Sequence, residues 1–511
     1  MISSNAQAVL EIGSTGIRLL VAEIDGSGQW RTLDEADRPV TLGRDVFTTG
    51  QVSRESFLEC LSVLKNFREM LAGWGVAGAD VHVIATSALR AARNREVFAD
   101  RVKLDTGCDL AIVEGIEENR LIYLAVRFAL KNDMASFWRG NSIIFEIGGG
   151  STEIMLLRRG KMVAAHSLRL GTILIDTQSR RARGGQGAFE RYLNENISST
   201  AGRLSQELDL AAVRTLVLAG SDARIAADNA GADLNEHCKI MTRGQFLQFA
   251  ERIQEYSIED CIARFNIRFA EAEFLNAGVQ VYRLLLEKTC AQDIIVPRIS
   301  IREGLLVDLA RGVDPQLQEE FYSQVSAGAL HLGRKYHFDE AHHRHVAALC
   351  MVLFDALARE HGLGRRERML LEVAASLHDI GMFIRGSGHH LHGQYIVTNA
   401  EIFGLHKEEL DLVGNVIRYH RGPLPSPADI DYIALQKEER IIVLKLASLL
   451  RVSDALDRGH SQQIKTISVE RREGSIVLHG PAGLDLSLER VALEEKAGLF
   501  QEVFGYKVLL F

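Results

Sequence analysis

Apolar and polar positions in the first 310 residues form short runs that glycine-rich turns interrupt. A strand, a Gly-Ser-Thr-Gly turn and a second strand are predicted for residues 7–25, QAVLEIGSTGIRLLVAEID. The same arrangement, followed by a third strand, is predicted for residues 142–165, SIIFEIGGGSTEIMLLRRGKMVAA. Helical periodicity covers residues 54–74, and further strands are predicted at residues 81–85, 111–114 and 215–220. This mixture indicates an α/β fold.

The two glycine turns are copies of one another. Glu11-Ile-Gly-Ser-Thr aligns with Glu146-Ile-Gly-Gly-Gly-Ser-Thr. Each copy is too long to be the unit of a solenoid. The repeat therefore predicts two similar α/β domains that face one another across a cleft.

The second part of the chain has a different pattern. From about residue 320, histidines become dense and helical periodicity dominates, as in LLEVAASLHDIG and RIIVLKLASLLRVSDALDRGH. Residues 464–511 alternate apolar and polar positions around turns, which is typical of a small α+β segment. The predicted domains are residues 1–130, 131–315, 316–462 and 463–511.

Composition sets further limits on the kind of protein. The 511 residues are enough for roughly three or four domains, and the net charge of −8 argues against a general nucleic-acid binder. We find no uncharged apolar stretch of about 18 residues that would predict a membrane span. The start of the chain lacks the pattern of a signal peptide. The six cysteines are scattered and form no CxxC pair, which favours a reduced, cytoplasmic enzyme.

The second glycine turn carries the strongest chemical signal. Three glycines in a row, at residues 148–150, allow successive backbone N–H groups to approach an anion closely. Ser151 and Thr152 add hydroxyl donors. Glu146 and Glu153 would repel a bare phosphate, but carboxylates are also ligands of Mg²⁺. The stretch is thus predicted to be a phosphate cradle with a metal or water site, the alternative being a tight hairpin with incidental acids. The second copy, at residues 11–18, favours the cradle.

Two other segments are expected to reach the same cleft. Residues 83–94, VIATSALRAARN, predict a strand that leads into a helix, with Arg90 and Arg93 three apart on one helix face. Glu117 and Glu118 begin another helix. The alternatives are ordinary surface arginines and ordinary capping acids.

Seven motifs in this order resemble the exopolyphosphatase/guanosine pentaphosphate phosphohydrolase (Ppx/GppA) family of the actin-like ATPase superfamily, in its long, four-domain form. They are EIGSTGIRLLVAEI, ATSALRAARN, EGIEENRLIYLAV, FEIGGGSTEI, HSLRLGT, LAGSDARIAA and IREGLL. The resemblance covers essentially the whole chain. It implies two actin-like (ribonuclease H-like) domains, followed by an all-α HD-like domain and a small α+β C-terminal cap.

The resemblance also implies site residues. Glu118 matches the catalytic acid that orients or deprotonates the attacking water, and Glu153 matches a second catalytic acid that binds metal or water. The residues implied to bind phosphate are Gly13, Ser14, Thr15, Arg93, Gly148, Gly149, Gly150, Ser151 and Thr152. Glu11 and Glu146 stand where the family usually has Asp as a metal ligand. Both departures add one methylene to a carboxylate that is expected to hold Mg²⁺, or Mn²⁺ in its place.

A second set of metal-type ligands lies in the helical part. His345, the pair His378-Asp379 and Asp454 follow the order H…HD…D of the HD phosphohydrolase superfamily, which they resemble. With His392 and His420 added, six ligands are enough for two metal ions about 3.5–4 Å apart. In the long-form family this domain is expected to serve dimerisation and polyphosphate binding with an incomplete metal set. The intact HD pair here favours a retained divalent metal.

Two histidines beside His345, at positions 342 and 343, are interpreted as surface residues.

These features lead to a functional hypothesis with two alternatives. The chain is expected to be a Mg²⁺-dependent phosphohydrolase that releases terminal phosphate from inorganic polyphosphate and from guanosine pentaphosphate, acting as a homodimer. One alternative is an HD-domain phosphohydrolase with a regulatory actin-like half. The other is a non-catalytic sensor of polyphosphate or guanosine polyphosphate nucleotides.

Overall fold

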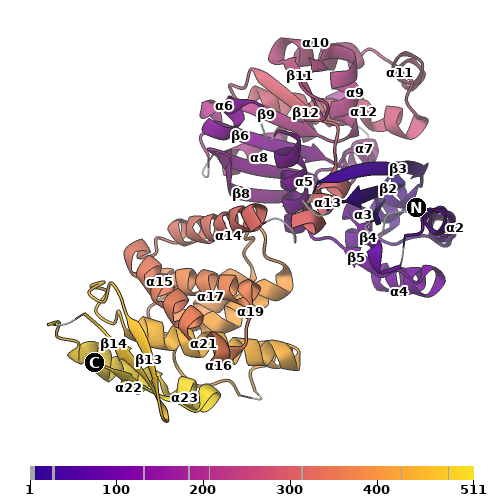
Figure 1. Ribbon diagram of the computed structural model, residues 1–511. Coiled ribbons are helices and arrows are strands. Elements are labelled where there is room, and N and C mark those ends of the chain that lie inside the picture. Colours follow the sequence, from indigo (N-terminus) through magenta and orange to yellow (C-terminus); the bar gives the residue numbers. More distant parts are fainter. Residues whose placement is uncertain are drawn as a thin grey trace. The chain divides into compact units, whose positions relative to one another are not determined.

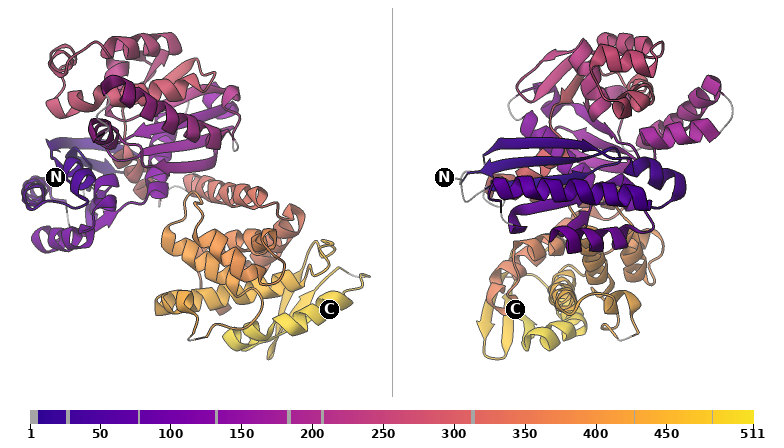
Figure 2. Two further views of the ribbon diagram at one scale, coloured as in Figure 1. Left: turned by 180° about the vertical axis from the view of Figure 1, so that it is seen from behind. Right: turned by 90° about the vertical axis from the view of Figure 1, so that its right-hand side faces the viewer.

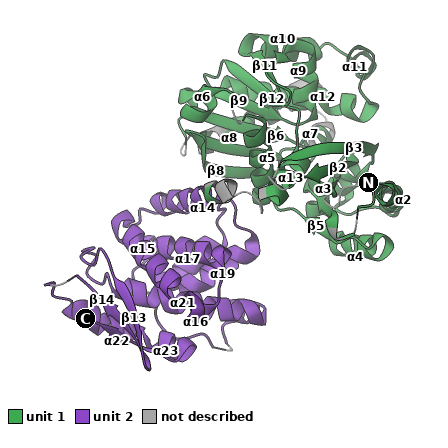
Figure 3. Ribbon diagram, viewed as in Figure 1, with its two compact units in different colours: residues 1–320 green, residues 321–511 purple. Residues whose placement is uncertain are grey.

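The structure is a computed structural model, and it divides the chain into two compact units. It describes residues 6–511 except 26–28, 77, 131–132, 182–184, 206–207, 312–314, 427 and 482. Unit 1 contains residues 1–320 and unit 2 contains residues 321–511 (Figure 3). The predicted boundary after residue 315 lies close to this division. The finer divisions at residues 130 and 462 stay predictions.

Unit 1 contains two mixed β-sheets (Figure 1). The first has the strand order β3-β2-β1-β4-β5, with β1 (Ala6–Ile12), β2 (Gly16–Ile24), β3 (Trp30–Pro39), β4 (Val81–Ala85) and β5 (Leu110–Ile112). The second has the order β10-β11-β12-β9-β6-β7-β8, with β6 (Asn141–Ile147), β7 (Thr152–Arg158), β8 (Lys161–Leu168), β9 (Val213–Ala219), β10 (Ala232–Asp233), β11 (Cys238–Thr242) and β12 (Asp293–Pro297).

The two sheets repeat one topology. In each, two antiparallel hairpin connections are followed by two parallel strands, so that β1, β2, β3, β4 and β5 correspond to β6, β7, β8, β9 and β12. Glu11 lies opposite Arg18 in the first hairpin, and Glu146 lies opposite Glu153 in the second. The predicted internal repeat is confirmed, and the α/β part has the expected actin-like arrangement.

Helices cover both faces of these sheets (Figure 2). They are α1 (Leu42–Thr49), α2 (Arg54–Gly73), α3 (Ser87–Ala91), α4 (Arg95–Thr106), α5 (Gly115–Ala129), α6 (Ala135–Arg139), α7 (Thr172–Arg181), α8 (Gly185–Leu204), α9 (Ser221–Ala230), α10 (Arg243–Ile253), α11 (Ile258–Phe265), α12 (Phe269–Glu287) and α13 (Ile301–Arg311), with 3₁₀ turns at η1 (Gly78–Asp80) and η2 (Leu210–Ala212). Because side chains alternate along a strand, Leu10 packs with Leu64 of α2 while Val9 packs with Leu121 of α5.

Helix α5, which carries Glu118, is fixed firmly against α13. A Cβ on Gly304 of α13 would lie 2.0 Å from the Leu121 carbonyl oxygen, so glycine is needed where the two helices meet. The buried Arg120 guanidinium binds Glu117 of the same helix at 2.6 Å and Asp308 of α13 at 2.8 Å. These contacts hold the start of α5, and with it Glu118, in one position.

Unit 2 is mainly helical. Helix α14 (Pro315–Lys335) contains the boundary between the units, and the remaining helices are α15 (Glu340–Ala356), α16 (Ala358–His361), α17 (Arg365–Leu377), α18 (His389–Thr398), α19 (Lys407–Arg418), α20 (Ile430–Ile433), α21 (Lys437–Ala455), α22 (Ser487–Lys496) and α23 (Gly498–Phe504), with a 3₁₀ turn at η3 (Ile380–Phe383). The tail adds a sheet of order β13-β14-β15, formed by β13 (Ser468–Arg472), β14 (Ser475–His479) and β15 (Lys507–Leu510). Among the described residues, no helix combines the length and the apolar character that crossing a membrane requires.

Candidate functional site

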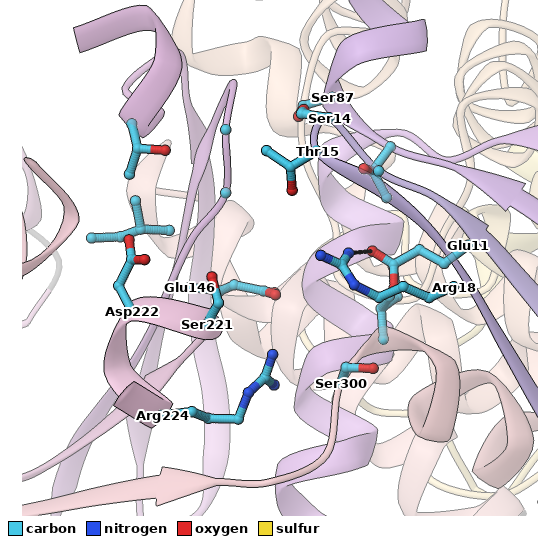
Figure 4. A pocket seen from close by; sticks show the side chains of 18 of the residues that line it. Glu11, Ser14, Thr15, Arg18, Ser87, Glu146, Ser221, Asp222, Arg224 and Ser300 are labelled. Carbon is cyan, nitrogen blue, oxygen red and sulfur yellow. Dashed lines mark hydrogen bonds and ion pairs between the residues drawn. The ribbon is translucent and has the colours of Figure 1, made fainter. Parts of the chain in front are cut away.

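A cavity of about 500 Å³ in unit 1 is lined by both glycine turns. Gly13, Ser14 and Thr15 come from the first turn, and Gly148, Gly149 and Ser151 come from the second. Ser14 Oγ lies 3.3 Å from Ser87 Oγ at the start of α3. Figure 4 shows side chains of both halves of unit 1 pointing into this space. Unit 1 thus brings the two copies of the repeat together at one site.

Four glutamates meet in the cavity, contributed by four elements. Glu11 comes from β1, Glu118 from α5, Glu146 from β6 and Glu153 from β7. Burial, together with the negative Glu118 and Glu11, raises the pKa of Glu146 to about 8. Burial also raises the pKa of Glu118, although the Arg90 guanidinium opposes this shift, and burial and Glu118 raise the pKa of Glu153. Glu11 and Glu153 are buried and Glu118 and Glu146 half-buried, and carboxylates grouped in this way favour a bound cation.

Arg90 contacts two of these acids, Glu118 and Glu153, and does not itself line the cavity. Its Nη1 donates to Glu118 Oε2 at 2.8 Å and to the Val113 carbonyl at 2.6 Å. Its Nη2 lies 3.7 Å from Glu153 Oε1 and donates to Ser151 Oγ at 3.4 Å. Among the described residues, Glu118 Oε1 accepts no hydrogen bond. The arrangement therefore fixes the Glu118 carboxylate and leaves one oxygen available to a water molecule.

Arg93 lies outside the cavity, contrary to the sequence-based expectation. Helix α3 ends at Ala91, so Arg90 and Arg93 do not share a helix face, and that prediction is wrong. The Arg93 side chain is exposed and donates to the Thr49 carbonyl at 3.1 Å. Arg90 is the arginine of this segment that reaches the acids.

Glu153 is held by neutral donors as well. Asn119 Nδ2 donates to its Oε2 at 3.0 Å, and Ser167 Oγ donates to its Oε1 at 2.8 Å. The residue is only 1% exposed. These contacts orient a buried carboxylate whose position in the cavity wall suits a ligand of metal or water.

The three glycines of the second turn are needed for close packing. None of Gly148, Gly149 and Gly150 has a positive φ. A Cβ on Gly149 would lie 2.7 Å from Ser14 Cβ, and a Cβ on Gly150 would lie 2.1 Å from Phe47 Cζ. The absence of side chains thus lets the two turns approach each other.

Two predicted phosphate-binding residues of this turn do not line the cavity. Gly150 packs against Phe47, and the buried Thr152 donates its hydroxyl to the Leu170 carbonyl. Both therefore support the turn from behind, whereas Gly148, Gly149 and Ser151 face the cavity.

Arginines line another part of the cavity, and the sequence analysis did not single them out. Arg18 Nη1 lies 3.4 Å from Glu11 Oε1, and Arg302 Nε lies 3.6 Å from Glu11 Oε2. The side chain of Arg224 forms no ion pair or hydrogen bond among the described residues, and its guanidinium points toward Glu146 (Figure 4). Burial, then Arg18 and Arg302, lower its pKa. This cationic wall is suited to an anionic ligand. These three arginines lie in the motifs GIRLL, SDARIAA and IREGLL, which could have identified them as candidate site residues.

Unit 2 contains a separate cluster of histidines and aspartates. The ligand atoms of His342, His378 and Asp454 lie within 4.8 Å of one another, as do those of Asp379, His389 and His420. His342 Nε2 and His378 Nε2 each lie 3.8 Å from Asp454 Oδ1. Of the predicted metal ligands, His378, Asp379, His420 and Asp454 are thus brought together.

The imidazoles of this cluster are oriented through their other nitrogen. Nδ1 of His342 lies 2.8 Å from Asp457 Oδ2, and Nδ1 of His378 lies 2.8 Å from the Ala375 carbonyl. Nδ1 of His389 and of His420 likewise lies 2.9 Å and 2.6 Å from a backbone carbonyl oxygen. Each Nδ1 thus has an acceptor of its own, and each Nε2 faces the cluster, an orientation that is typical of histidines that bind metals.

Two predicted ligands are replaced by neighbouring histidines. His342 and His343 are 0% and 2% exposed, so their interpretation as surface residues is wrong. His342 joins the cluster, while His345 is only half-buried and lies outside it. His389 joins the cluster in the same way, and His392 does not. In both cases the helix turns the predicted residue away from the buried face.

Family comparisons cover almost the whole chain. The model of the Ppx/GppA phosphatase family matches residues 20–312, and that of Ppx/GppA phosphatase domain III matches residues 326–497. The chain belongs to the Ppx/GppA phosphatase family. The resemblance found in the sequence is confirmed, and so is the prediction of a hydrolase.

Relatives of this Ppx/GppA chain are similar over nearly their full length. A protein of Vibrio atlanticus named guanosine-5'-triphosphate,3'-diphosphate pyrophosphatase is 24% identical over 464 residues, which are 88% of this chain and 87% of the relative. A protein of the same name from Photobacterium profundum is 23% identical over 96% of this chain and 95% of its own length.

Solved structures resemble unit 1. The Ppx/GppA family member of Aquifex aeolicus is 26% identical, with a TM-score of 0.51 and coverage of 61% of this chain and 99% of its own. An exopolyphosphatase from Cytophaga hutchinsonii, 20% identical and with a TM-score of 0.55, shows the same fold over 61% of this chain and 99% of its own.

Proposed function

We propose that this Ppx/GppA hydrolase releases terminal phosphate from inorganic polyphosphate and from guanosine pentaphosphate, and that the reaction takes place in the unit 1 cavity. The observation that carries the proposal is the combination, in one cavity, of Glu118, two glycine turns and an arginine wall. Hydrolysis of a phosphoanhydride needs a positioned water molecule and neutralisation of the charge on the transferred phosphoryl group. The names of the relatives agree with this class of substrate.

Glu118 has the position of the residue that orients the attacking water. The residue lines the cavity, its Oε2 is held by Arg90, and its Oε1 has no hydrogen-bond partner among the described residues. The water oxygen would attack the terminal phosphorus, the bridging P–O bond would break, and the water proton would pass to the Glu118 carboxylate. The backbone N–H groups of the glycine turns and the hydroxyls of Ser14 and Ser151 would stabilise the transferred phosphoryl.

The carboxylates of the cavity fit a hard divalent cation. Glu11, Glu146 and Glu153 line the same cavity and offer oxygen ligands, which Mg²⁺ and Mn²⁺ prefer. These residues would hold the ion, and the ion would neutralise charge on the phosphate oxygens. The side chains of Glu11 and Glu146 are one methylene longer than the usual Asp. Their carboxylates would therefore hold the ion further from the backbone.

Phosphate release tests the proposal. The full-length chain is incubated with triphosphate, long-chain polyphosphate or guanosine pentaphosphate, first with Mg²⁺ and then with Mn²⁺, and free phosphate is measured. We expect metal-dependent release from at least one of these substrates. The proposal fails if all of them bind but none is hydrolysed with either metal, and the sensor alternative then takes its place.

We also propose that the cluster in unit 2 binds divalent metal. The specific observation is that four buried imidazoles use Nδ1 for hydrogen bonds and direct Nε2 at two aspartates. Imidazole and carboxylate ligands suit transition-metal ions. If this centre hydrolysed phosphate, as an HD phosphohydrolase would, replacing His378 and Asp379 by alanine would abolish phosphate release.

A further inference from the structure

Lys496, the last residue of α22, reaches the metal-type cluster of unit 2. Its ammonium group forms an ion pair with Asp454 Oδ2, and its side chain is only 15% exposed. We propose that the centre has two unlike positions. One divalent transition-metal ion is held by Asp379, His389 and His420, and the ammonium group of Lys496 takes the place of a second ion beside Asp454. This inference rests on the proposed metal binding by unit 2.

The first position has a complete set of ligands. Asp379 Oδ1 lies 2.8 Å from His389 Nε2 and 3.5 Å from His420 Nε2, and the two Nε2 atoms lie 3.4 Å apart. Two ligand atoms that are each about 2.1 Å from one ion are expected to lie roughly 3–4 Å apart. Both imidazoles are almost fully buried. This half of the cluster therefore needs only a small adjustment to enclose an ion.

Arg451 fixes the segment that carries His420. Within the described part of the chain the buried guanidinium has no acidic partner, and burial lowers its pKa. It donates to the carbonyls of Tyr419 and Gly422, both at 2.7 Å, one on each side of His420. The buried guanidinium therefore stabilises the backbone on both sides of His420, and this fixes the orientation of the His420 imidazole.

The second position has ligands but also a cation. Oδ2 of Asp379 lies 3.6 Å from His378 Nε2, so this carboxylate faces both halves of the cluster. Nε2 of His342 and of His378 is buried without a hydrogen-bond partner and lies 3.8 Å from Asp454 Oδ1. That separation is too long for a hydrogen bond and suits two ligands of one ion. Lys496, however, already neutralises Asp454.

The net charge of the cluster determines whether a second ion can bind beside Lys496. The carboxylates of Asp379 and Asp454 are the anionic ligands. The buried Asp457 beside His342 adds a negative charge, and Arg421, whose Nη1 lies 3.4 Å from His389 Nε2, offsets it. One divalent ion together with the Lys496 ammonium slightly exceeds the charge of the two ligand carboxylates, whereas two divalent ions beside that ammonium would leave a large buried positive charge. Buried charge without compensation is strongly unfavourable. A second ion therefore requires the loss or withdrawal of Lys496.

Counting bound Co²⁺ tests the inference. Full-length chains are stripped with a chelator, dialysed against Co²⁺ and analysed for cobalt per chain. The Asp379→Ala variant lacks the shared ligand and reports the ions that lie outside unit 2. We expect the wild type to bind one ion more than Asp379→Ala, and Lys496→Met to bind two ions more than Asp379→Ala. The second ion should bind Lys496→Met at least about tenfold more tightly than it binds the wild type, because a like charge about 4 Å away has been removed. Lys496→Arg keeps the cation and should bind like the wild type.

A second comparison locates the single ion with ligand variants and measures the effect of Lys496 on stability. His389→Ala should lose the ion, and Asp454→Asn should keep it. In chelator, Lys496→Met leaves Asp454 buried and unpaired, so its melting temperature should fall, and Co²⁺ should raise it by more than in the wild type.

The outcomes separate the two proposals. If Asp379→Ala binds as much cobalt as the wild type, unit 2 is not a metal site, and the underlying proposal fails. If unit 2 loses one ion in Asp379→Ala but Lys496→Met gains none, the metal site stands and the role of Lys496 is wrong. Two ions in unit 2 of the wild type, or loss of the single ion in Asp454→Asn, would also overturn the inference.

Discussion

The cavity of unit 1 and the cluster of unit 2 bring together different ligand types. The cavity combines glutamates with arginines and with glycine turns that expose backbone N–H groups. The cluster combines imidazoles with two aspartates and with one lysine. Oxygen ligands beside cationic side chains suit a phosphate chain with a hard cation, whereas imidazoles suit a transition metal. The difference favours hydrolysis in unit 1 and metal storage or structural metal binding in unit 2.

The same contrast occurs on a smaller scale between the two glycine hairpins. Opposite Glu11 the first hairpin has Arg18, which neutralises it, while opposite Glu146 the second has another acid, Glu153. One topology therefore presents a charge pair on one side of the cavity and two acids on the other. The acids are placed for metal and water, and the arginines for the substrate phosphates.

The largest expected effect is that of Glu118→Gln. Because this change removes the proton acceptor but keeps the shape of the side chain, we expect phosphate release to fall by about 10²–10⁴-fold with substrate binding nearly unchanged. Initial rates and equilibrium binding of triphosphate measure the two quantities. Glu114→Gln, at the exposed N-cap of α5, is the matched control and should retain most activity. A loss below about tenfold for Glu118→Gln would place the base elsewhere.

The arginine wall should contribute less than the base. Arg224→Met removes a charged donor without an ion-pair partner in the described structure, and a charge-assisted hydrogen bond contributes about 1.5–3 kcal/mol. We therefore expect KM for polyphosphate to rise about 10–100-fold while kcat changes little. Arg298, which also lines the cavity but pairs with Asp233 at 2.5 Å, provides the control variant Arg298→Met. Equal effects of the two variants would argue against a specific role of Arg224.

A smaller effect is expected for Glu146→Asp. This change restores the side-chain length that is usual at this position, and Mg²⁺ has stricter geometric demands than larger cations. We expect activity to stay within about fivefold of wild type and the ratio of the rates with Mg²⁺ and Mn²⁺ to change. Glu146→Gln, which removes the charge, should lose far more activity. If Glu146→Asp is inactive with both metals, the longer side chain is a requirement and not a tolerated departure.

The strands around the cavity could be predicted closely from the sequence. The predicted strand at residues 81–85 coincides with β4, and the two glycine hairpins occur where the alternation of apolar residues places them. Glu118 could be selected because it lies in the first turn of a predicted helix, and Glu146 and Glu153 because they flank the second glycine turn. Their mutual contacts depend on the packing of the two halves of unit 1, which the pattern of one chain does not specify.

The errors arose where a helix face or a helix end had to be chosen. In α15 the buried positions His342, Val346, Leu349 and Leu353 share a face, while His345 lies on the side of the exposed Val352. Helical periodicity would have selected His342, but the motif H…HD…D alone did not. The ending of α3 at Ala91 and the contact of Lys496 with Asp454, 42 residues apart, are set by tertiary structure.

The division of roles between the two units is tested most directly by one double variant. His378→Ala with Asp379→Ala removes two ligands of the unit 2 cluster and leaves the unit 1 cavity intact. Phosphate release from triphosphate by the full-length variant is compared with the wild type at equal folded fraction, and cobalt content confirms that the metal is lost. Since distant, unconnected sites act nearly independently, we expect a rate within about twofold of wild type. Complete loss of hydrolysis in a folded variant would contradict the account and place the active site in unit 2.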